Sequence, residues 1–293
     1  MHKSVLLNEV IEYFDPKPNQ NFIDCTVGEA GHSLAILKKI KPNGKVLGID
    51  VDAESLKRIT PKNGLILVKA NFKNLKKIAE EQGFNKVDGV LIDLGLSSWQ
   101  IEESGKGFTY KKDEPLSMIM NGNQVVTAQE IINTWPEETL IQIFREYGEE
   151  RFAKNIIQKI VQQRGLSPIK TTLQLFEIIK RSVPFSKTSR GRTDRVAARI
   201  FQALRIVVND EMENLKSGLE QALQILNKEG RVVVISFHSL EDRVVKWFFK
   251  EKEKEGKIRI LTKKPITAGR AELIANSRSR SAKLRAAMYI GEI

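Results

Sequence analysis

Cysteine and histidine are scarce in this sequence of 293 residues, and their scarcity excludes several kinds of site. Cys25 is the only cysteine, so no disulfide can form within the chain and no cysteine-based metal site is available. His2, His32 and His238 are the only histidines, and they are not spaced like a zinc cluster. No apolar run reaches the roughly 20 residues of a membrane span, and none has the flanks of a signal peptide. We therefore expect a cytoplasmic protein with no metal ion and no membrane partner.

Positive charge is concentrated in two segments of the chain, whose formal net charge is +12 at pH 7. Residues 180–205 contain eight Lys or Arg and one acid, and residues 257–293 contain nine Lys or Arg and two acids. The rest of the chain is therefore slightly acidic. Two basic segments on a nearly neutral protein favour a polyanionic partner, above all a nucleic acid. Either segment alone is equally compatible with an ordinary solvated surface.

The first hundred residues alternate between short strand patterns and helix patterns. The expected strands are 21–27, 45–51, 65–70 and 87–95, and the expected helices are 32–40, 53–59 and 72–82. This alternation predicts βαβ units and a parallel sheet covered by helices on both faces. Ligands bind such sheets at the carboxyl ends of the strands, where this chain has Asp24, Asp50 and Asp93.

The pattern changes after about Gly105. Residues 127–181 read as four short helices, and an apolar stripe at helical spacing then runs from Leu204 to Leu226. Strand character returns at 230–237. We therefore predict an α/β protein, with a Rossmann-like sheet interrupted by an all-helical insertion. The sheet domain is expected to comprise residues 1–110 and 205–293, and the insertion, an expected RNA-recognition domain, residues 111–204.

The stretch DCTVGEAGHS, residues 24–33, stands where the first strand should turn into a helix. It does not match the dinucleotide fingerprint G-x-G-x-x-G, because Ala30 and Ser33 occupy the second and third glycine positions. A phosphate-binding Walker loop is excluded because no Gly-Lys-Ser/Thr follows. The pattern D-x-T-x-G-x-A-G is instead similar to the S-adenosylmethionine turn of methyltransferases. Asp50 could accept hydrogen bonds from the ribose of S-adenosylmethionine or of NAD, and together the two features favour S-adenosylmethionine.

Eight stretches of the sequence occur in an order that is typical of one enzyme family. They are SVLLNEVI (4–11), DCTVGEAGHS (24–33), DGVLIDLGLSSWQ (88–100), GFTY (107–110), YGEE (147–150), FQALRIVVN (201–209), ISFHSLEDRVVK (235–246) and NSRSRSAKLRAA (276–287). Together they closely resemble the bacterial ribosomal RNA small-subunit methyltransferase H family over essentially the whole chain. The resemblance implies S-adenosylmethionine-dependent methylation of N4 of a cytidine in 16S ribosomal RNA near the decoding site, within the assembled small subunit.

The resemblance also implies which residues contact the cofactor. These are Ala30, Gly31, His32, Asp50, Phe72, Asp93 and Gln100. In this scheme the backbone of 30–32 holds the methionine end, Asp50 the ribose and Phe72 a face of the adenine, while Asp93 lies nearest the methyl donor. The chain differs from the family pattern at Ala30, where glycine is usual. It also reads PLSMIM at 115–120, where the family commonly reads P-L-D-M-R-M.

Amino methylation needs a hydrogen-bond acceptor, because the lone pair of the cytosine amine is delocalised into the ring. Asp93 is the first candidate for orienting the amine. His238, just after the strand expected at 230–237, is a second catalytic candidate that could relay a proton, although a structural hydrogen bond explains it equally well. Phosphate contacts are expected from a basic cluster near the C-terminus, which comprises Arg278, Arg280, Lys283 and Arg285.

Two other functions remain open at this point. One is a ribosome-assembly factor that binds RNA but has reduced or lost turnover, which the PLSMIM stretch would explain. The other is an NAD-dependent enzyme, which the poor dinucleotide match disfavours. A homodimer is compatible with the helical insertion.

Overall fold

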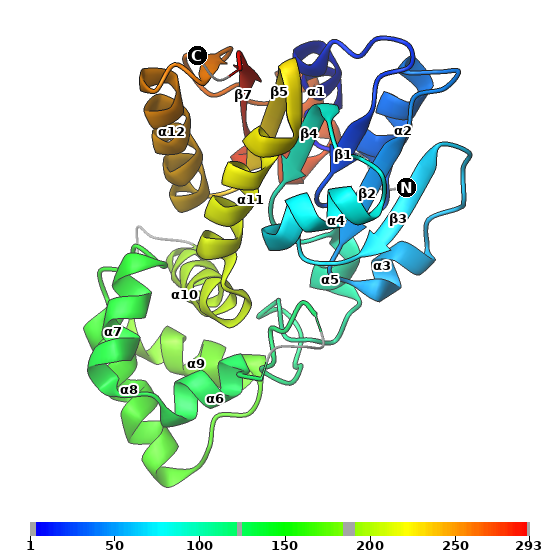
Figure 1. Ribbon diagram of the computed structural model, residues 1–293. Coiled ribbons are helices and arrows are strands. Elements are labelled where there is room, and N and C mark those ends of the chain that lie inside the picture. The colour runs from blue at the N-terminus through cyan, green and yellow to red at the C-terminus, as the bar shows by residue number, and fades with distance from the viewer. Residues whose placement is uncertain (1–3, 122–124, 184–190, 292–293) are drawn as a thin grey trace. The chain divides into compact units, whose positions relative to one another are not determined.

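The computed structural model describes residues 4–121, 125–183 and 191–291 (Figure 1). The chain forms two compact units: unit 1 comprises Met1–Gly95 and Met212–Ile293, and unit 2 comprises Leu96–Glu211. Residues 111–204 lie within the range of unit 2, and the boundaries and RNA-recognition role expected for the insertion stay a prediction. Across the described ranges, no helix combines the length and the hydropathy that crossing a bilayer requires.

Unit 1 contains a seven-stranded sheet in the order β3-β2-β1-β4-β5-β7-β6. The strands are β1 (Phe22–Asp24), β2 (Val46–Asp50), β3 (Leu65–Lys69), β4 (Val87–Asp93), β5 (Leu226–Ser236), β6 (Ile258–Ile260) and β7 (Lys283–Tyr289). Strands β1 to β5 are parallel, and β7 is antiparallel to both β5 and β6. The strand order reverses between β1 and β4, which in such sheets marks the ligand crevice. The Rossmann-like sheet expected from the sequence is confirmed.

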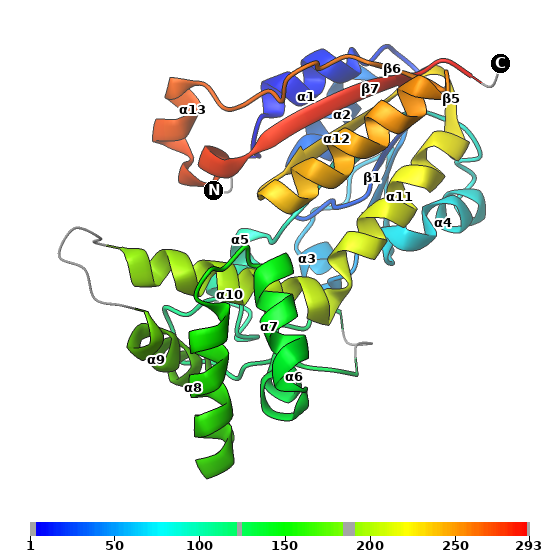
Figure 2. The ribbon, with the colours of Figure 1, turned by 90° about the vertical axis from the view of Figure 1, so that its left-hand side faces the viewer.

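Helices cover both faces of this sheet, as Figures 1 and 2 show. The helices of unit 1 are α1 (Leu7–Phe14), α2 (Gly31–Lys39), α3 (Ala53–Lys57), α4 (Leu75–Glu81), α11 (Glu211–Ile225), α12 (Ser239–Lys254) and α13 (Arg270–Ala275), with the short 3₁₀ helices η1 (Phe72–Asn74) and η2 (Ser277–Ser281). Successive side chains of a strand point to opposite faces. Leu91 therefore packs in one apolar cluster with α1 and α2, while its neighbour Ile92 packs in another with α4, α11 and α12. Parallel strands buried on both faces explain the continuous apolar runs in the sequence.

Unit 2 is helical, as expected. Its helices are α5 (Ser98–Glu102), α6 (Ala128–Thr134), α7 (Glu137–Glu146), α8 (Ala153–Leu166), α9 (Thr172–Ser182) and α10 (Arg192–Asn209). They enclose an apolar core of their own, with Phe144, Ile157 and Leu204 fully buried. Part of the first basic segment, residues 184–190, lies outside the described residues.

The apolar stripe from Leu204 to Leu226 is not one helix. Asp210 has a left-handed backbone conformation with φ 54°, and it separates α10 from α11. At the other end of the stripe, α11 stops at Ile225, and Leu226 already pairs with Val87 as the first residue of β5. The spacing predicted the buried face of these residues correctly but did not reveal either break.

Cys25 follows β1 directly and is buried, with 2 % of its surface exposed. Its N–H donates to the carbonyl of Leu91 on the neighbouring strand, at 2.9 Å. Burial, with a smaller contribution from the carboxylate of Asp24, raises the pKa of its thiol well above the usual value.

Candidate active site

The turn after β1 is held by a buried carboxylate. Asp24 accepts hydrogen bonds from the N–H of Thr26 at 3.2 Å and from the hydroxyl of Ser33 at 2.6 Å. Burial raises the pKa of Asp24, while these two hydrogen bonds and the nearby His32 oppose that effect. Both oxygens of Asp24 therefore serve the turn, tying its start to the first turn of α2.

Asp50, at the carboxyl end of β2, faces the same turn. One oxygen accepts the N–H of Gly28 at 3.0 Å, and the other accepts the N–H of Asp52 at 2.9 Å. Burial raises the pKa of Asp50 to about 6, although hydrogen bonds from the two amides act in the opposite direction. Each carboxylate oxygen has a second lone pair, so Asp50 can still accept hydrogen bonds from a diol.

The start of α2 offers unoccupied backbone donors. Ala30 precedes the helix in a left-handed conformation with φ 61°, and no side chain caps the first turn. This conformation is typical of glycine and costs an L-residue on the order of 1 kcal/mol. A side chain at Gly31 would collide with Ser4, because an added Cβ would lie 2.0 Å from the Ser4 hydroxyl oxygen. The uncapped N–H groups of α2 suit an anionic group such as a carboxylate.

His32, which is buried, and Asp93, which is half-buried, form a pair beside this turn. The Nε2 atom of His32 lies 3.4 Å from a carboxylate oxygen of Asp93, and only 5 % of His32 is exposed. Among the described residues, neither ring nitrogen of His32 nor Oδ1 of Asp93 has a hydrogen-bond partner. The backbone N–H of Asp93 donates to the hydroxyl of Thr26 at 2.8 Å, which fixes the end of β4 against the turn.

The protonation of His32 depends on the acids around it. Burial acts to lower its pKa, but Asp93, together with Asp24 and Glu272, outweighs burial and raises it. The charged form of His32 is therefore favoured. Buried polar atoms without partners are rare in folded proteins, and here they are clustered where a ligand can supply the missing hydrogen bonds.

Phe72 lies in η1, after β3, and its half-buried ring packs on Gly218 of α11. An added Cβ at Gly218 would lie 2.6 Å from the ring, so only glycine allows this approach. The hydroxyl of Ser217 donates to the carbonyl of Lys73 at 2.9 Å, which fastens η1 to α11. These contacts hold the edge of the Phe72 ring that faces Gly218.

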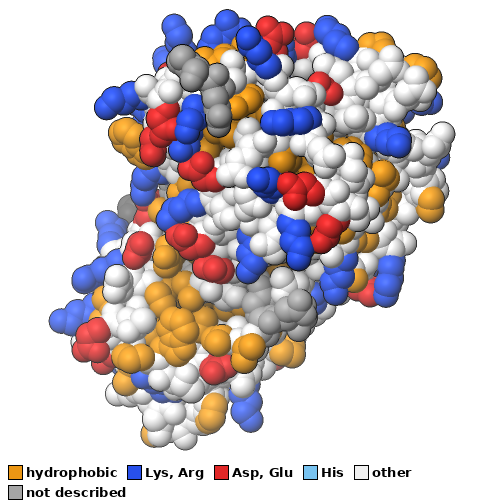
Figure 3. All heavy atoms as spheres, in the orientation of Figure 1, with side chains coloured by type: hydrophobic (Ala, Val, Ile, Leu, Met, Phe, Trp, Pro, Cys, Tyr) orange, Lys and Arg blue, Asp and Glu red, His pale blue; other side chains and the backbone are white. Residues whose placement is uncertain are grey.

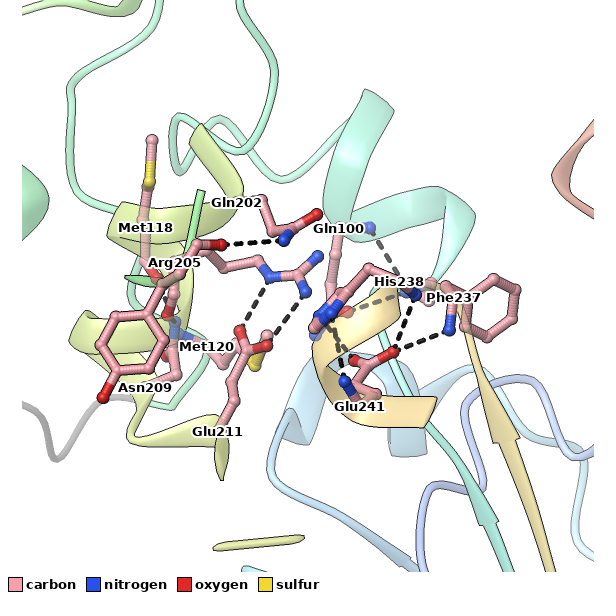
Figure 4. Close-up of polar contacts among 12 residues, drawn as sticks. Gln100, Met118, Met120, Gln202, Arg205, Asn209, Glu211, Phe237, His238 and Glu241 are labelled. Carbon is pink, nitrogen blue, oxygen red and sulfur yellow. Dashed lines mark hydrogen bonds and ion pairs between the residues drawn. The ribbon is translucent and has the colours of Figure 1, made fainter. Parts of the chain in front are cut away.

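His238 has a clear structural role as the N-cap of α12. Its Nδ1 accepts the N–H of Glu241 at 3.4 Å, and Oε2 of Glu241 accepts the N–H groups of Phe237 and His238 at 2.7 and 3.2 Å (Figure 4). The Nε2 atom of His238 lies 3.0 Å from Oε1 of Glu241 without the orientation of a hydrogen bond. The catalytic role of His238 stays a prediction.

Gln100 belongs to unit 2, where it forms a capping box with Ser97 at the start of α5. Its side-chain oxygen accepts the N–H of Ser97 at 2.9 Å, while its own N–H donates to the Ser97 hydroxyl at 3.2 Å. Gln100 is buried, with 6 % of its surface exposed. Its contact with a cofactor also stays a prediction.

The PLSMIM stretch of unit 2 is fastened to α10 by Asn209. The amide of Asn209 donates to the carbonyl of Met118 at 2.8 Å and accepts the N–H of Met120 at 2.9 Å (Figure 4). Ile119 packs against the apolar core of unit 2. Ile119, which stands where the family commonly has arginine, therefore lies in a largely apolar environment.

The basic cluster near the C-terminus divides into two kinds of residue. Arg285 is buried and forms a fork with Asp242, at 2.7 and 3.3 Å, and the Nζ atom of Lys283 lies 3.5 Å from the same carboxylate. Burial alone would raise the pKa of Asp242, but these two cations lower it. Arg280 is exposed, and Arg278 is half-buried in η2. Arg285 is thus a structural ion-pair partner, and only part of the cluster is on the surface.

Three residues that hold this site were not singled out from the sequence. Thr26 and Ser33 anchor Asp93 and Asp24, and Glu272 of α13 accepts the N–H of Leu6 at 2.8 Å and raises the pKa of His32. Thr26 and Ser33 lie within the turn, where their hydroxyls were a visible signal. Glu272 had none, because it is 240 residues from His32 in the sequence.

The sheet order and the turn at its reversal point define an S-adenosylmethionine-dependent methyltransferase. The chain belongs to the MraW methylase family, whose model matches residues 1–290. It is 44% identical over 303 residues to the ribosomal RNA small subunit methyltransferase H of Clostridium botulinum (strain Loch Maree / Type A3), with 97% of each chain covered. It is 42% identical over 310 residues to the protein of the same name from Heliobacterium modesticaldum, covering 99% of this chain and 98% of that one.

A solved rRNA methylase from Streptococcus thermophilus aligns over 99% of both chains with a TM-score of 0.44 and 9% identity. At that level the likeness adds nothing to the family assignment.

Proposed function

We propose that this protein transfers a methyl group from S-adenosylmethionine to N4 of a cytidine in 16S ribosomal RNA, near the decoding site of the small subunit. The observation that carries the proposal is the pair of His32 and Asp93, which leaves buried polar atoms without partners among the described residues, beside the turn after β1. The named activity of the two relatives and the basic segments of this chain support RNA as the substrate.

The residues present suit this cofactor. The uncapped start of α2, at Ala30, Gly31 and His32, would receive the methionine carboxylate, and Asp50 would accept the ribose hydroxyls. Phe72 would lie along the adenine. The Oδ1 atom of Asp93 would accept a hydrogen bond from either the methionine ammonium or the substrate amine. The contact from Gln100 rests on the family resemblance alone.

The bound cofactor supplies an electrophilic methyl carbon, and the protein has to align the amine with it. We assign that task to Asp93, because its backbone is fixed by Thr26 and its side chain is held beside His32. A carboxylate that accepts an N–H of the amine favours the pyramidal nitrogen needed for attack. The same carboxylate, paired with a cationic His32, can then hold the proton that N4 releases.

Methyl transfer itself is the test. The protein is incubated with labelled S-adenosylmethionine and small ribosomal subunits from cells that lack the endogenous enzyme, and the labelled nucleoside is identified. We expect label in N4-methylcytidine. Asp93→Asn should lower kcat by about 100-fold or more, since general acid–base groups typically contribute 10²–10⁴-fold.

Asp88→Asn is the matched control for that variant. Asp88 lies at the opposite end of β4, where it accepts hydrogen bonds from Asn21 and Asn227. We expect the Asp88→Asn substitution to leave kcat unchanged. Label in a different nucleoside, or full activity of Asp93→Asn, would refute the proposed chemistry.

A second candidate function is an RNA-binding ribosome-assembly factor with reduced or lost turnover. The observation that favours it is the PLSMIM stretch, where Ser117 and Ile119 replace the usual acid and base. Cofactor binding without label in any nucleoside of intact subunits would support this candidate. Ser117→Asp combined with Ile119→Arg would then show whether the usual pair restores transfer. Sedimentation of the purified protein tests the homodimer, which stays a prediction.

A further inference from the structure

One face of α12 carries cations around an exposed aromatic ring. At 100° per residue, Arg243, Lys246, Trp247, Lys250 and Lys254 fall on one side of the helix, and all five are exposed. The opposite side packs into unit 1 through Val245 and Phe249, each about 1% exposed. Figure 3 shows Lys and Arg side chains, with acidic and apolar ones between them, over the region of unit 1 where Figure 1 draws α12.

Trp247 is not needed for the apolar core. Its side chain is 57% exposed, and it is the only aromatic residue among the strongly exposed large apolar side chains of the described chain. The Nζ atoms of Lys250 and Lys246 lie 4.9 and 5.5 Å from the centre of its ring. The ring is therefore presented to solvent with two ammonium groups close to it.

The three lysines of this face are exposed and stay available to an external partner. Across the part of the chain that the structure describes, Lys246, Lys250 and Lys254 form no ion pair with an acid. The nearby acids are engaged elsewhere. Asp242 pairs with Arg285, Glu253 accepts the N–H of Ile260 at 2.9 Å, and Glu255 pairs with Lys252 and Lys257. Glu251 flanks the face without dividing it.

The face also begins close to the candidate active site. Helix α12 starts immediately after β5, at the carboxyl edge of the sheet, with His238 as its cap. From Arg243 to Lys254 the face runs about 16 Å along the helix, at 1.5 Å per residue. A chain leaving that edge can therefore follow the helix for several nucleotides.

We infer that this face of α12 binds a single-stranded segment of the RNA substrate, with phosphates on its three lysines and one base stacked on Trp247. The inference rests on the proposed function. Aromatic platforms set in a basic groove are how proteins hold single strands without reading their sequence. A membrane surface fits less well, because a helix that lies on a bilayer presents several large apolar residues, whereas this face has one.

The experiment compares Trp247→Ala, Trp247→Phe and the double variant Lys246→Ala/Lys250→Ala with the wild type. Methyl transfer to small subunits provides KM and kcat, and a labelled single-stranded RNA of about 12 nucleotides provides affinity as a function of salt. Trp247→Ala should raise KM for the subunit about 5- to 150-fold, given roughly 1–3 kcal/mol for one stacked base. The value of kcat at saturation should not change, and Trp247→Phe should retain most of the affinity.

The lysine pair should act through phosphate contacts. Removing both should flatten the slope of log affinity against log salt by about 1.4, at roughly 0.7 per contact with single strands. Lys38→Ala/Lys39→Ala, which removes two exposed lysines from α2, is the matched control and should leave KM unchanged.

The outcomes separate this inference from the proposed function. A wild type that labels no nucleoside overturns the proposed function, while the oligonucleotide arm still tests the face. A wild type that methylates subunits, with unchanged KM and oligonucleotide affinity in all α12 variants, overturns the inference alone. Sedimentation with phosphatidylserine-containing vesicles that depends on Trp247, without any effect on RNA binding, would instead assign the face to a lipid surface.

Discussion

Asp24, Asp50 and Asp93 end three neighbouring strands, yet the structure gives their carboxylates different partners. Asp24 and Asp50 each accept one hydrogen bond on each oxygen, but Asp24 is buried and Asp50 is half-buried. Asp93 keeps an oxygen that has no partner among the described residues. The difference decides which carboxylate can act on a ligand. At the scale of the residue, the ability of a carboxylate to bind a ligand therefore depends on its exposure and on whether its oxygens still lack hydrogen-bond partners.

The raised pKa of Asp50 predicts two opposite effects of pH. An aspartate in the unfolded chain titrates near 3.9, and Asp50 in the folded protein near 6. As pH falls from about 6 to 4, the folded state takes up this proton first, so the contribution of Asp50 to folding stability becomes more favourable. Ribose hydroxyls need the ionised carboxylate, so cofactor affinity should instead fall, about tenfold between pH 7.5 and 5.

Calorimetric titration with S-adenosylmethionine across that range measures the effect. Asp50→Asn is the control, because an amide does not titrate and should bind weakly with a flatter pH profile. A wild-type affinity that is constant from pH 7.5 to 5 would show that Asp50 does not hold the ribose.

Most candidate residues near the sheet edge could be named from the sequence, but their roles could not. Asp50 and Asp93 were visible because strand ends and acids follow the chain order. That Asp24 is consumed by Ser33, or that Arg285 is buried on Asp242, depends on contacts between distant segments. The left-handed conformation of Ala30 had one signal, since glycine is usual at this position in the family that the sequence resembles.

At the scale of the element, α12 depends on its first turn. His238 and Glu241 cap the helix reciprocally, which satisfies backbone donors that would otherwise lack partners. The helix in turn carries Val245 and Phe249 into the core and the basic face to the surface. A single cap therefore supports both packing and the proposed RNA contact.

The cap offers a test of whether His238 is catalytic or structural. His238→Ala should lower the free energy of unfolding by about 1 kcal/mol, whereas His238→Asn, another good N-cap, should restore most of it. Urea unfolding measures stability, and methyl transfer at saturating substrates measures kcat. If His238 acts only as a cap, His238→Asn has the wild-type kcat; a loss of 10²-fold or more in a stable Asn variant would indicate proton transfer.

The sequence predicted which segments form helices and strands better than it predicted the residues at which they begin and end. The alternating runs identified the parallel strands because burial on both faces leaves continuous apolar stretches. The break at Asp210 was missed, since an apolar stripe can continue in register across a residue that leaves the helix. The strand expected at 21–27 ends at Asp24, because the residues that follow form the turn between β1 and α2.

At the scale of the whole molecule, the uneven charge is the feature that the sequence showed most directly. It favoured a polyanionic partner before any fold was considered, because charge needs no tertiary contact to be counted. The face on α12 lies outside both basic segments, since its cations are interleaved with acids in the sequence and separate only when the helix forms. The basic face is recognised only when these residues are placed on a helix at 100° per residue.

The reactivity of the Cys25 thiol can report transient unfolding of unit 1. It is the sole thiol of the chain, and it lies buried between the end of β1 and the cofactor turn. A thiol reagent should therefore modify the native protein only through transient unfolding of unit 1, while modification in denaturant is complete and rapid. Saturating S-adenosylmethionine should slow the reaction by the factor 1 + [L]/Kd by which binding lowers the open population, so mass spectra taken over time would report cofactor binding without any RNA. Fast modification that the cofactor does not alter would mean that this part of the sheet opens independently of the site beside it.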